Sequence, residues 1–268
     1  MAEPVYSPVI AVAKLAFKAL GMTVTVTGAE HVPRSGGAVL AINHVSYLDF
    51  IFAGFAALRS GRYTRFMAKE SVFTHRLSGP LMRGMKHIPV DRDAGSGSFR
   101  TAMRALKSGE VVGIFPEATT SRSFVVKDLK SGAVRLAQAT GTPLVPVAVW
   151  GGQRMFTKGG KRQLTRRHGH VYISVGEPIP TPKGANGEEI TQHLRTVLQT
   201  MLDDLQARTP EQPAPGESPW WHPAHLGGSA PTLEAAAVLE EAERAEKAAK
   251  RAARAAAKAT RKQGPESG

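Results

Sequence analysis

A histidine and an aspartate stand five positions apart in segment 43–49 (NHVSYLD), directly after the apolar run 38–42. If that run is a strand and a helix begins near Ser46, His44 lies at the carboxyl end of the strand and Asp49 one turn into the helix. A carboxylate that orients an imidazole lets it remove a proton from an alcohol, because it fixes the tautomer and stabilises the imidazolium. On spacing alone, the simpler interpretation of a helix-capping histidine and a solvated acid is favoured.

A second polar cluster follows another apolar run, in segment 114–123 (IFPEATTSRS). Here a strand ends at a proline, and one short loop presents Glu117, Thr119, Thr120 and Arg122. Glu117 could accept a hydrogen bond from a hydroxyl group, while the loop amides, the hydroxyls and Arg122 could donate to a phosphate. The loop therefore predicts a binding site for a phosphorylated alcohol.

Two further strand ends complete the pattern. Segment 84–92 predicts a strand that delivers Arg92, whose guanidinium could hold a phosphate with two hydrogen bonds. Segment 143–150 predicts a core strand, and its Val145-Pro146 pair suggests an edge position or a bend, because proline donates no hydrogen bond to a neighbouring strand.

Strands and helices alternate along most of the chain. The expected strands are 23–27, 38–42, 65–68, 87–90, 111–115, 144–150 and 170–175. The expected helices are 49–59, a helix reaching residue 83, 98–108, 129–140 and 187–207. This order predicts an α/β fold with a mixed, largely parallel sheet flanked by helices, and with reactive residues at the carboxyl ends of strands.

Four parts are expected: an N-terminal amphipathic helix (1–22), an α/β domain (23–207), a strap rich in proline and glycine (208–231) and a charged tail (232–268). One face of the first helix is apolar and another is basic; the residues are Ile10, Ala13, Phe17 and Leu20 against Lys14 and Lys18. That face could pack on the domain or lie in a lipid interface, and both remain open.

The strap and the tail differ in composition. Trp220 and Trp221 predict that the strap docks on the domain, although a lipid contact would also suit them. The tail pairs Glu240 with Arg244 at helical spacing, and it has no large apolar residue after Leu239. We therefore expect a solvated helix or a disordered tail rather than a coiled coil.

Charge and composition narrow the function. The chain has 268 residues, no cysteine and a formal net charge of +13, which excludes disulfides and thiolate chemistry and favours an anionic partner. No apolar run is long enough to span a membrane, and we expect no signal peptide. A metal site at His168 and His170 is disfavoured, and neither a metal nor a cofactor is expected.

Together these segments resemble the blocks of the glycerolipid acyltransferase family, whose best-known members are the 1-acylglycerol-3-phosphate (lysophosphatidate) acyltransferases. Segment 43–49 is similar to its Asn-His-x4-Asp block, 88–92 to its second block and 145–147 to its fourth. Residues 115–117 are similar to the start of its Phe-Pro-Glu-Gly-Thr-Arg block, and 67–70 to a short lysine-bearing segment. The resemblance covers roughly residues 24–178.

The resemblance implies a reaction and its residues. His44 would be the general base and Asp49 would orient it, so that the sn-2 hydroxyl of 1-acylglycerol-3-phosphate attacks the thioester of acyl-CoA or acyl-carrier protein and gives phosphatidate. No acyl-enzyme is required. The acceptor's glycerol phosphate would be bound by residues Lys69, Arg92, Glu117, Thr119, Thr120 and Arg122. The enzyme would act peripherally at the cytoplasmic face of an anionic membrane.

The third block departs from the family pattern. Ala118 stands where the family usually has glycine, and Thr120 where it usually has arginine. Arg122 could replace the missing cation; otherwise the acceptor would be a different lysolipid. Two weaker alternatives are a nucleic-acid-binding protein, which the basic charge suggests, and a hydrolase, for which no Gly-x-Ser-x-Gly motif is present. No nucleic-acid partner is expected.

Overall fold

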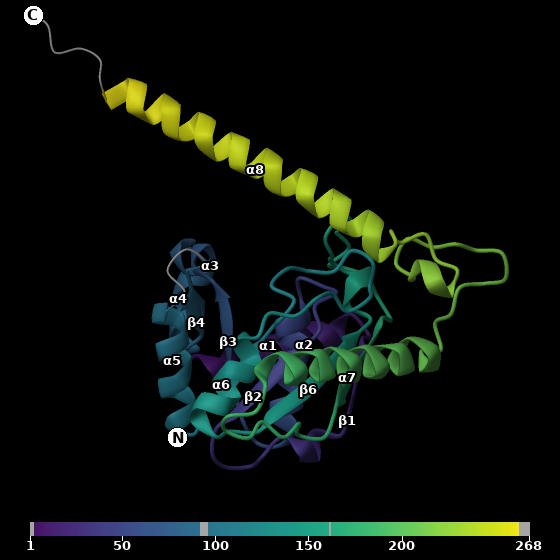
Figure 1. Ribbon diagram of the computed structural model, residues 1–268. Helices are drawn as coiled ribbons and strands as arrows, with labels where there is room; N and C mark the ends of the chain where they lie inside the picture. Colours follow the sequence, from purple (N-terminus) through teal and green to yellow (C-terminus); the bar gives the residue numbers. More distant parts are fainter. Residues whose placement is uncertain (1–2, 92–95, 161, 263–268) are drawn as a thin grey trace, which may run out of the picture.

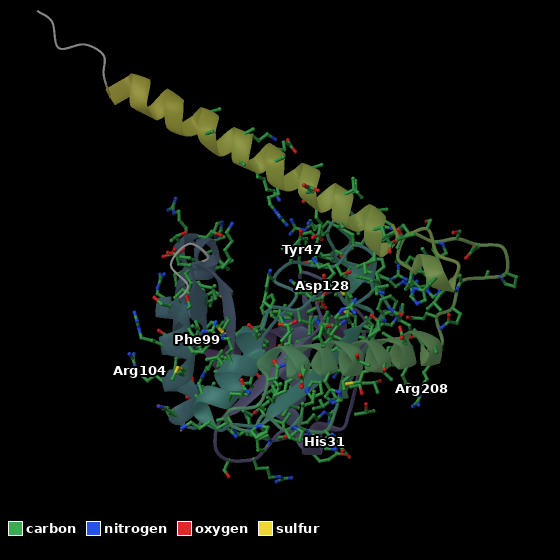
Figure 2. The ribbon with its side chains drawn as sticks, viewed as in Figure 1. His31, Tyr47, Phe99, Arg104, Asp128 and Arg208 are labelled. Carbon is green, nitrogen blue, oxygen red and sulfur yellow. The ribbon has the colours of Figure 1, made fainter. Side chains whose placement is uncertain are left out.

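The computed structural model describes residues 3–91, 96–160 and 162–262, and a seven-stranded sheet lies at its centre (Figure 1). The strands are β1 (Thr23–Thr27), β2 (Ala38–Ile42), β3 (Thr64–Lys69), β4 (Ile88–Val90), β5 (Val111–Ile114), β6 (Leu144–Trp150) and β7 (His170–Val175). Their order is β1-β7-β6-β2-β5-β3-β4. Only the β6–β7 pair is antiparallel, so the predicted mixed, largely parallel sheet is confirmed.

Helices cover both faces of the sheet (Figure 1). They are α1 (Tyr6–Ala19), α2 (Asp49–Arg59), α3 (Glu70–Thr74), α4 (Ser78–Gly84), α5 (Ser96–Lys107), α6 (Gly132–Thr140), α7 (Gly187–Arg208) and α8 (Leu233–Lys262). In β2, Val39 and Ala41 contribute to the core under α5, α6 and α7, whereas Leu40 and Ile42 contribute to the core under α2. This alternation of buried side chains makes β2 a central strand of a three-layer fold.

The carboxyl ends of β2 and β5 meet because the two strands are parallel neighbours. Val39 pairs with Val112 and Leu40 pairs with Gly113. The segments that follow, which contain His44 and Glu117, therefore start from the same edge of the sheet. Motifs that lie far apart in the sequence are brought together in this way.

Two local predictions are corrected. The helix expected to reach Arg83 is two short helices, α3 and α4, separated at residues 75–77. Strand β6 lies inside the sheet between β2 and β7, so an edge position for Pro146 is wrong. The other alternative, a bend, agrees with the pairing. The β6–β7 register slips by one residue between the Val147–Val175 pair and the Leu144–Ile179 bridge. Such a bulge accommodates a residue that lacks an N–H group.

The N-terminal helix α1 packs on the domain. The ring of Phe17 lies 5.3 Å from that of Phe52. Just before the helix, buried Glu3 forms an ion pair of 2.6 Å with Arg65, which is itself only 3% exposed. The opposite face of α1 is exposed, and it carries Val12 and Leu15. The packing interpretation is therefore confirmed for the inner face.

The strap docks on the domain as predicted. Trp220 packs against the core beneath α7, and the guanidinium of Arg154 lies 4.0 Å above the ring of Trp221. Beyond the strap, α8 crosses the body and extends past it (Figure 1).

The expectation that the tail is fully solvated is wrong for its first turns. Glu240 bonds to Lys127 and Lys158 of the body rather than to Arg244. The absence of large apolar residues after Leu239 does not reveal this contact, because the contact is ionic.

Candidate active site

His44 and Asp49 meet as their spacing predicts. Asp49 is the first residue of α2 and is fully buried, and its Oδ2 lies 3.0 Å from Nδ1 of His44. The same oxygen accepts hydrogen bonds of 2.7 Å from the backbone N–H groups of Val45 and Ser46. An oxygen that already accepts two donors favours N–H on Nδ1, which leaves Nε2 of His44 free to accept a proton. The imidazole is 18% exposed, so the side chain is not sealed inside the core.

The environment of Asp49 pulls its pKa in two directions. Burial raises the pKa above its ordinary value, whereas the hydrogen bonds from His44, Ser46 and Val45 act in the opposite direction. Oδ1 of Asp49 is buried without a hydrogen-bond partner within the described part of the chain. All of the carboxylate's described hydrogen bonds therefore serve the turn that carries His44.

A hydroxyl group already lies on the other side of the imidazole. Oγ1 of Thr120 is 3.1 Å from Nε2 of His44, and Thr120 is only 3% exposed. The sequence predicted that Thr120 binds phosphate, but in the structure its hydroxyl is paired with the imidazole. This hydroxyl marks the position from which a proton can pass to His44.

Glu117 holds the backbone of the site together. One of its oxygens accepts from the N–H of His44 at 2.7 Å, and the other accepts from the N–H of Lys127 at 3.2 Å. Burial raises the pKa of Glu117 to about 8, although these N–H groups and the Lys127 ammonium favour the charged form. Its predicted role in binding the acceptor stays a prediction, whereas these contacts give it a positioning role that the sequence did not reveal.

Ala118, which stands where the family usually has glycine, adopts a backbone conformation that is typical of glycine. Ala118 has a φ of +62°, in the left-handed region that glycine adopts at lower cost. The turn shape at this position is therefore the one that a glycine would favour, and the alanine adopts it despite its Cβ.

An apolar cavity of about 240 Å³ is linked to His44 through two aromatic rings. The ring of Phe115 is 4.4 Å from the imidazole, and the ring of Phe66, which lines the cavity, is 6.2 Å from Phe115. The other lining residues come from α1, α2, α3 and α4 and from the segment after α4; they include Val9, Ile10, Ala13, Ile51, Gly54, Phe55, Leu58, Leu81 and Met82. We call this space the apolar cavity.

The polar groups that line the apolar cavity form hydrogen bonds within the protein. The Tyr6 hydroxyl donates to the carbonyl of Thr64, and Nδ1 of His87 accepts from the N–H of Phe66. Burial lowers the pKa of His87 to about 4, so its imidazole is neutral at pH 7. The space can therefore hold a hydrocarbon without leaving charged groups unpaired.

A second cavity, of about 500 Å³, lies beneath α8. Lys69 at the end of β3 lines it, together with Thr119 and Lys158, and α8 contributes Glu240, Glu243, Arg244 and Lys247. We call this space the cationic cavity. Two predicted site residues, Lys69 and Thr119, are thus brought together, whereas Arg92 lies outside the described residues.

Arg122 bonds to Glu243 of α8, and Glu243 lines the cationic cavity. Lys127 and Lys158 were not recognised from the sequence. Lys127 could have been found, because it follows Arg122 by five positions in the same loop. Lys158 belongs to the loop after β6 and has no motif around it. In the described part of the chain, no three His, Asp or Glu side chains are grouped as metal ligands.

Comparison with known proteins places this geometry in a family. Residues 23–150 match the family model described as Acyltransferase. A 1-acyl-sn-glycerol-3-phosphate acyltransferase of Bacillus subtilis (strain 168) is 33% identical over 186 residues, which are 68% of this chain and 91% of the relative. The chain belongs to the acyltransferase family. The residues that match the family model include the pair His44 and Asp49, whereas α7, the strap and α8 lie outside that range.

Two further relatives show how far the likeness extends. A chloroplastic 1-acyl-sn-glycerol-3-phosphate acyltransferase of Arabidopsis thaliana, LPAT1, is 28% identical over 67% of this chain, and the match spans about half of that relative, 49%. The crystal structure of the 1-acyl-sn-glycerophosphate (LPA) acyltransferase PlsC from Thermotoga maritima superimposes with a TM-score of 0.63 at 26% identity, covering 76% of this acyltransferase and 81% of that chain. The fold implied by the sequence blocks is therefore that of the family.

Proposed function

We propose that this acyltransferase moves a fatty acyl group from an acyl thioester to the sn-2 hydroxyl of 1-acylglycerol-3-phosphate and gives phosphatidate for phospholipid synthesis. The observation that carries the proposal is the position of His44. The rings of Phe115 and Phe66 link its imidazole to the apolar cavity, and Thr120 links it to the neighbouring Thr119 of the cationic cavity. The names of the relatives support the same acceptor.

The site residues supply a simple proton path. Nε2 of His44 takes the proton of the acceptor hydroxyl, and Asp49 stabilises the imidazolium. The acceptor oxygen forms a C–O bond with the thioester carbonyl carbon, and the C–S bond breaks. The leaving thiolate then takes the proton from His44. No bond to the protein is needed.

The apolar cavity supports a fatty acyl donor. An acyl chain placed there would extend past Phe66 and Phe115, with its thioester near His44. Burial of each methylene contributes roughly 0.8 kcal/mol, so even part of a chain gives useful affinity. Both acyl-CoA and acyl-carrier protein carry such a chain.

The cationic cavity supports a phosphorylated acceptor. Lys69 and Thr119 line it, and Arg122 bonds to Glu243 of its lining. In this proposal the acceptor hydroxyl takes the place of the Thr120 hydroxyl at Nε2 of His44. The acceptor phosphate then lies near Lys69 and Arg122. Arg122 then supplies the positive charge that the altered third block lacks at Thr120.

We further propose that the enzyme works on the cytoplasmic face of an anionic membrane. Val12 and Leu15 on the outer face of α1 are each 67% exposed, and Lys14 and Lys18 accompany them. Among the described helices, none is both long and apolar enough to cross a bilayer. Replacing Val12 and Leu15 with serine should reduce cosedimentation with anionic vesicles; undiminished binding would refute this surface.

The central test is a release assay. Purified protein with lysophosphatidate and a long-chain acyl-CoA should release free CoA, and His44→Ala should reduce turnover by at least about 10²- to 10⁴-fold. Circular dichroism and the melting temperature should show that the variant is folded. Unchanged turnover in a folded His44→Ala variant would remove His44 from its role.

The contact between Thr120 and His44 also allows a different route. In that route the Thr120 hydroxyl, activated by His44, would attack the thioester and carry the acyl group. Thr120→Val keeps the shape but removes the hydroxyl. We expect this variant to retain most of its turnover, since the acceptor is attacked directly; complete loss, with a covalent acyl adduct on the wild-type protein, would favour the acyl-enzyme.

A further inference from the structure

Helix α8 presents two carboxylates to the body, Glu240 and Glu243, one turn apart. The carboxylate of Glu240 accepts from Nζ of Lys127 at 3.1 Å and lies 3.5 Å from Nζ of Lys158. Glu243 lies 3.2 Å from Nζ of Lys158 and also pairs with Arg122. Two acidic groups of the tail thus meet three basic groups of the family domain and its following loops.

These charges are largely removed from water. The side chains of Arg122, Lys127 and Lys158 are only 15%, 14% and 13% exposed, and Glu240 is 14% exposed. Burial alone would raise the pKa of Glu240, but Lys127 and Lys158 lower it overall, so the carboxylate is charged. Buried cations of this kind need an anion, because an unpaired buried charge is costly.

The ion cluster adjoins the proposed acceptor site. Nζ of Lys127 donates to Oγ1 of Thr119, and that hydroxyl also reaches Glu240 at 3.4 Å. The next residue, Thr120, contacts His44. Neighbouring residues of one loop therefore contact the tail carboxylates and the imidazole of His44.

We propose that Arg122, Lys127 and Lys158 form a phosphate-monoester site that α8 occupies with Glu240 and Glu243 until the acceptor displaces them. The inference rests on the proposed function, because it identifies the acceptor's phosphate as the competing anion. A phosphate monoester carries about −1.5 to −2 charges near pH 7, which is close to the charge of two carboxylates.

The cluster retains one unused donor that fits this exchange. Nε of Arg122 is buried and has no hydrogen-bond partner within the described residues. A phosphate presents three acceptor oxygens, so it can satisfy this N–H in addition to the groups that the carboxylates now satisfy. The acceptor phosphate is thus a better complement to the cluster than the tail.

Little apolar surface resists the release of α8. Val238 and Leu239 are 68% and 46% exposed, although Ala236 near the start of the helix is buried. The docked strap keeps the helix close after release, because Trp220 and Trp221 remain bound to the body. Tethering gives the carboxylates a high effective concentration, so α8 returns when product leaves.

The kinetic test compares two pairs of substitutions in the full chain. Glu240→Gln with Glu243→Gln removes the competing charges, whereas Glu241→Gln with Glu246→Gln removes two charges from exposed positions of the same helix. The first pair should lower KM for lysophosphatidate by about tenfold without changing kcat, as expected if about one molecule in ten is open in the wild type. The control pair should match the wild type.

Two kinetic results would overturn the proposal. An unchanged KM in the Glu240/Glu243 variant would mean that α8 does not compete with the acceptor. A loss of turnover in this variant, with a normal melting temperature, would mean that the glutamates assist catalysis. A salt series gives a second measure, because the difference between the two pairs should shrink as ionic strength rises.

A binding test does not depend on turnover. Hydrogen exchange of amides 233–250 is measured in the His44→Ala chain with lysophosphatidate, glycerol 3-phosphate, inorganic phosphate or monoacylglycerol. Exchange should increase with lysophosphatidate and glycerol 3-phosphate, less with inorganic phosphate, and not with monoacylglycerol, which lacks phosphate. Unchanged exchange with every phosphate ligand refutes the proposal.

The two tests separate this inference from the proposed function. Turnover of lysophosphatidate without any response of α8 refutes the displacement alone. Release of α8 by phosphate ligands in a protein that transfers no acyl group supports the phosphate site and refutes the proposed function.

Discussion

The apolar cavity and the cationic cavity are closed by helices that bind to the body in different ways. Helix α1 covers the apolar cavity with Val9, Ile10 and Ala13, whose contacts depend on excluding water. Helix α8 covers the cationic cavity with Glu240 and Glu243, whose contacts depend on charge and weaken with salt. The apolar cavity is thus built into the core, whereas the cationic cavity is closed by charged groups that, in our proposal, another anion replaces.

The largest loss of activity is expected for a change in the His44–Asp49 pair. Asp49→Asn should keep an oxygen for the N–H groups of Val45 and Ser46 but remove the charge that stabilises the His44 imidazolium. We expect kcat to fall on the order of 10²- to 10⁴-fold while KM for both substrates changes little. A variant with more than a tenth of wild-type kcat would show that orientation suffices without the negative charge.

A smaller loss of activity is expected when cations are removed from the cluster beneath α8. Lys127→Met with Lys158→Met removes two cations, and a hydrogen bond to a charged group is worth roughly 1.5–3 kcal/mol. We expect kcat/KM for lysophosphatidate to fall by about 10- to 100-fold, whereas KM for acyl-CoA stays near the wild-type value. Lys107→Met with Lys130→Met, at exposed positions, serves as the control. An equal effect of both pairs would mean that overall charge, not this cluster, is responsible.

The apolar side should change chain-length preference instead. A Cβ at Gly54 would meet only the Phe66 ring at 3.8 Å, so a larger residue can enter the apolar cavity without a clash at its Cβ. Gly54→Leu should shift the preferred acyl-CoA to shorter chains, by about 0.8 kcal/mol for each methylene displaced. Competition between acyl-CoA lengths measures this, and Ala11→Leu on the exposed face of α1 is the control. An unaltered preference would separate the cavity from the donor.

Glu117, which accepts hydrogen bonds from the N–H groups of His44 and Lys127, is expected to affect stability rather than turnover. Because its folded pKa of about 8 lies above the ordinary 4.5, the folded chain keeps a proton that the unfolded chain has released between these values. Wild-type stability should therefore fall relative to Glu117→Gln as pH rises through this window, by at most about 1.4 kcal/mol per pH unit.

Urea unfolding of both chains at about pH 5 and about pH 8 measures this difference. The low pKa of His87 costs stability as pH falls below its ordinary 6.5, but it does so in both chains and cancels. Parallel pH profiles of the two proteins would contradict the raised pKa of Glu117.

The core of the site could be predicted from the sequence. Parallel strands place their carboxyl ends at one edge, so His44 and Glu117 were expected at the same edge once both runs were recognised as strands. The sequence did not predict that β2 and β5 are neighbours in the sheet. The spacing within one turn likewise brought Asp49 to His44. These are consequences of backbone geometry, which residue types and periodicity encode.

The remaining features depend on contacts that periodicity does not encode. Lys158 and Glu240 meet across two loops and a strap, and their contact is ionic, so it leaves no apolar pattern. The hydroxyl of Thr120 could point to a phosphate or to His44, and only the turn through Ala118 decides between them. The bulge at Pro146 was predicted in part. The missing N–H of proline indicated an edge position or a bend, but it did not show that the strand lies inside the sheet.

The pairing of β2 with β5 has a consequence for synthesis of the chain. Glu117 reaches the N–H of His44 across 73 residues, and Thr120 reaches its imidazole across 76. Loops of this length close slowly compared with local helices. A nascent chain that ends before Glu117 thus has His44 and Asp49 but neither the Glu117 carboxylate nor the Thr120 hydroxyl that contact His44 in the folded protein. The chain therefore acquires acyl-transfer activity only after β2 and β5 have paired. The time at which activity appears during refolding reports when this pairing occurs.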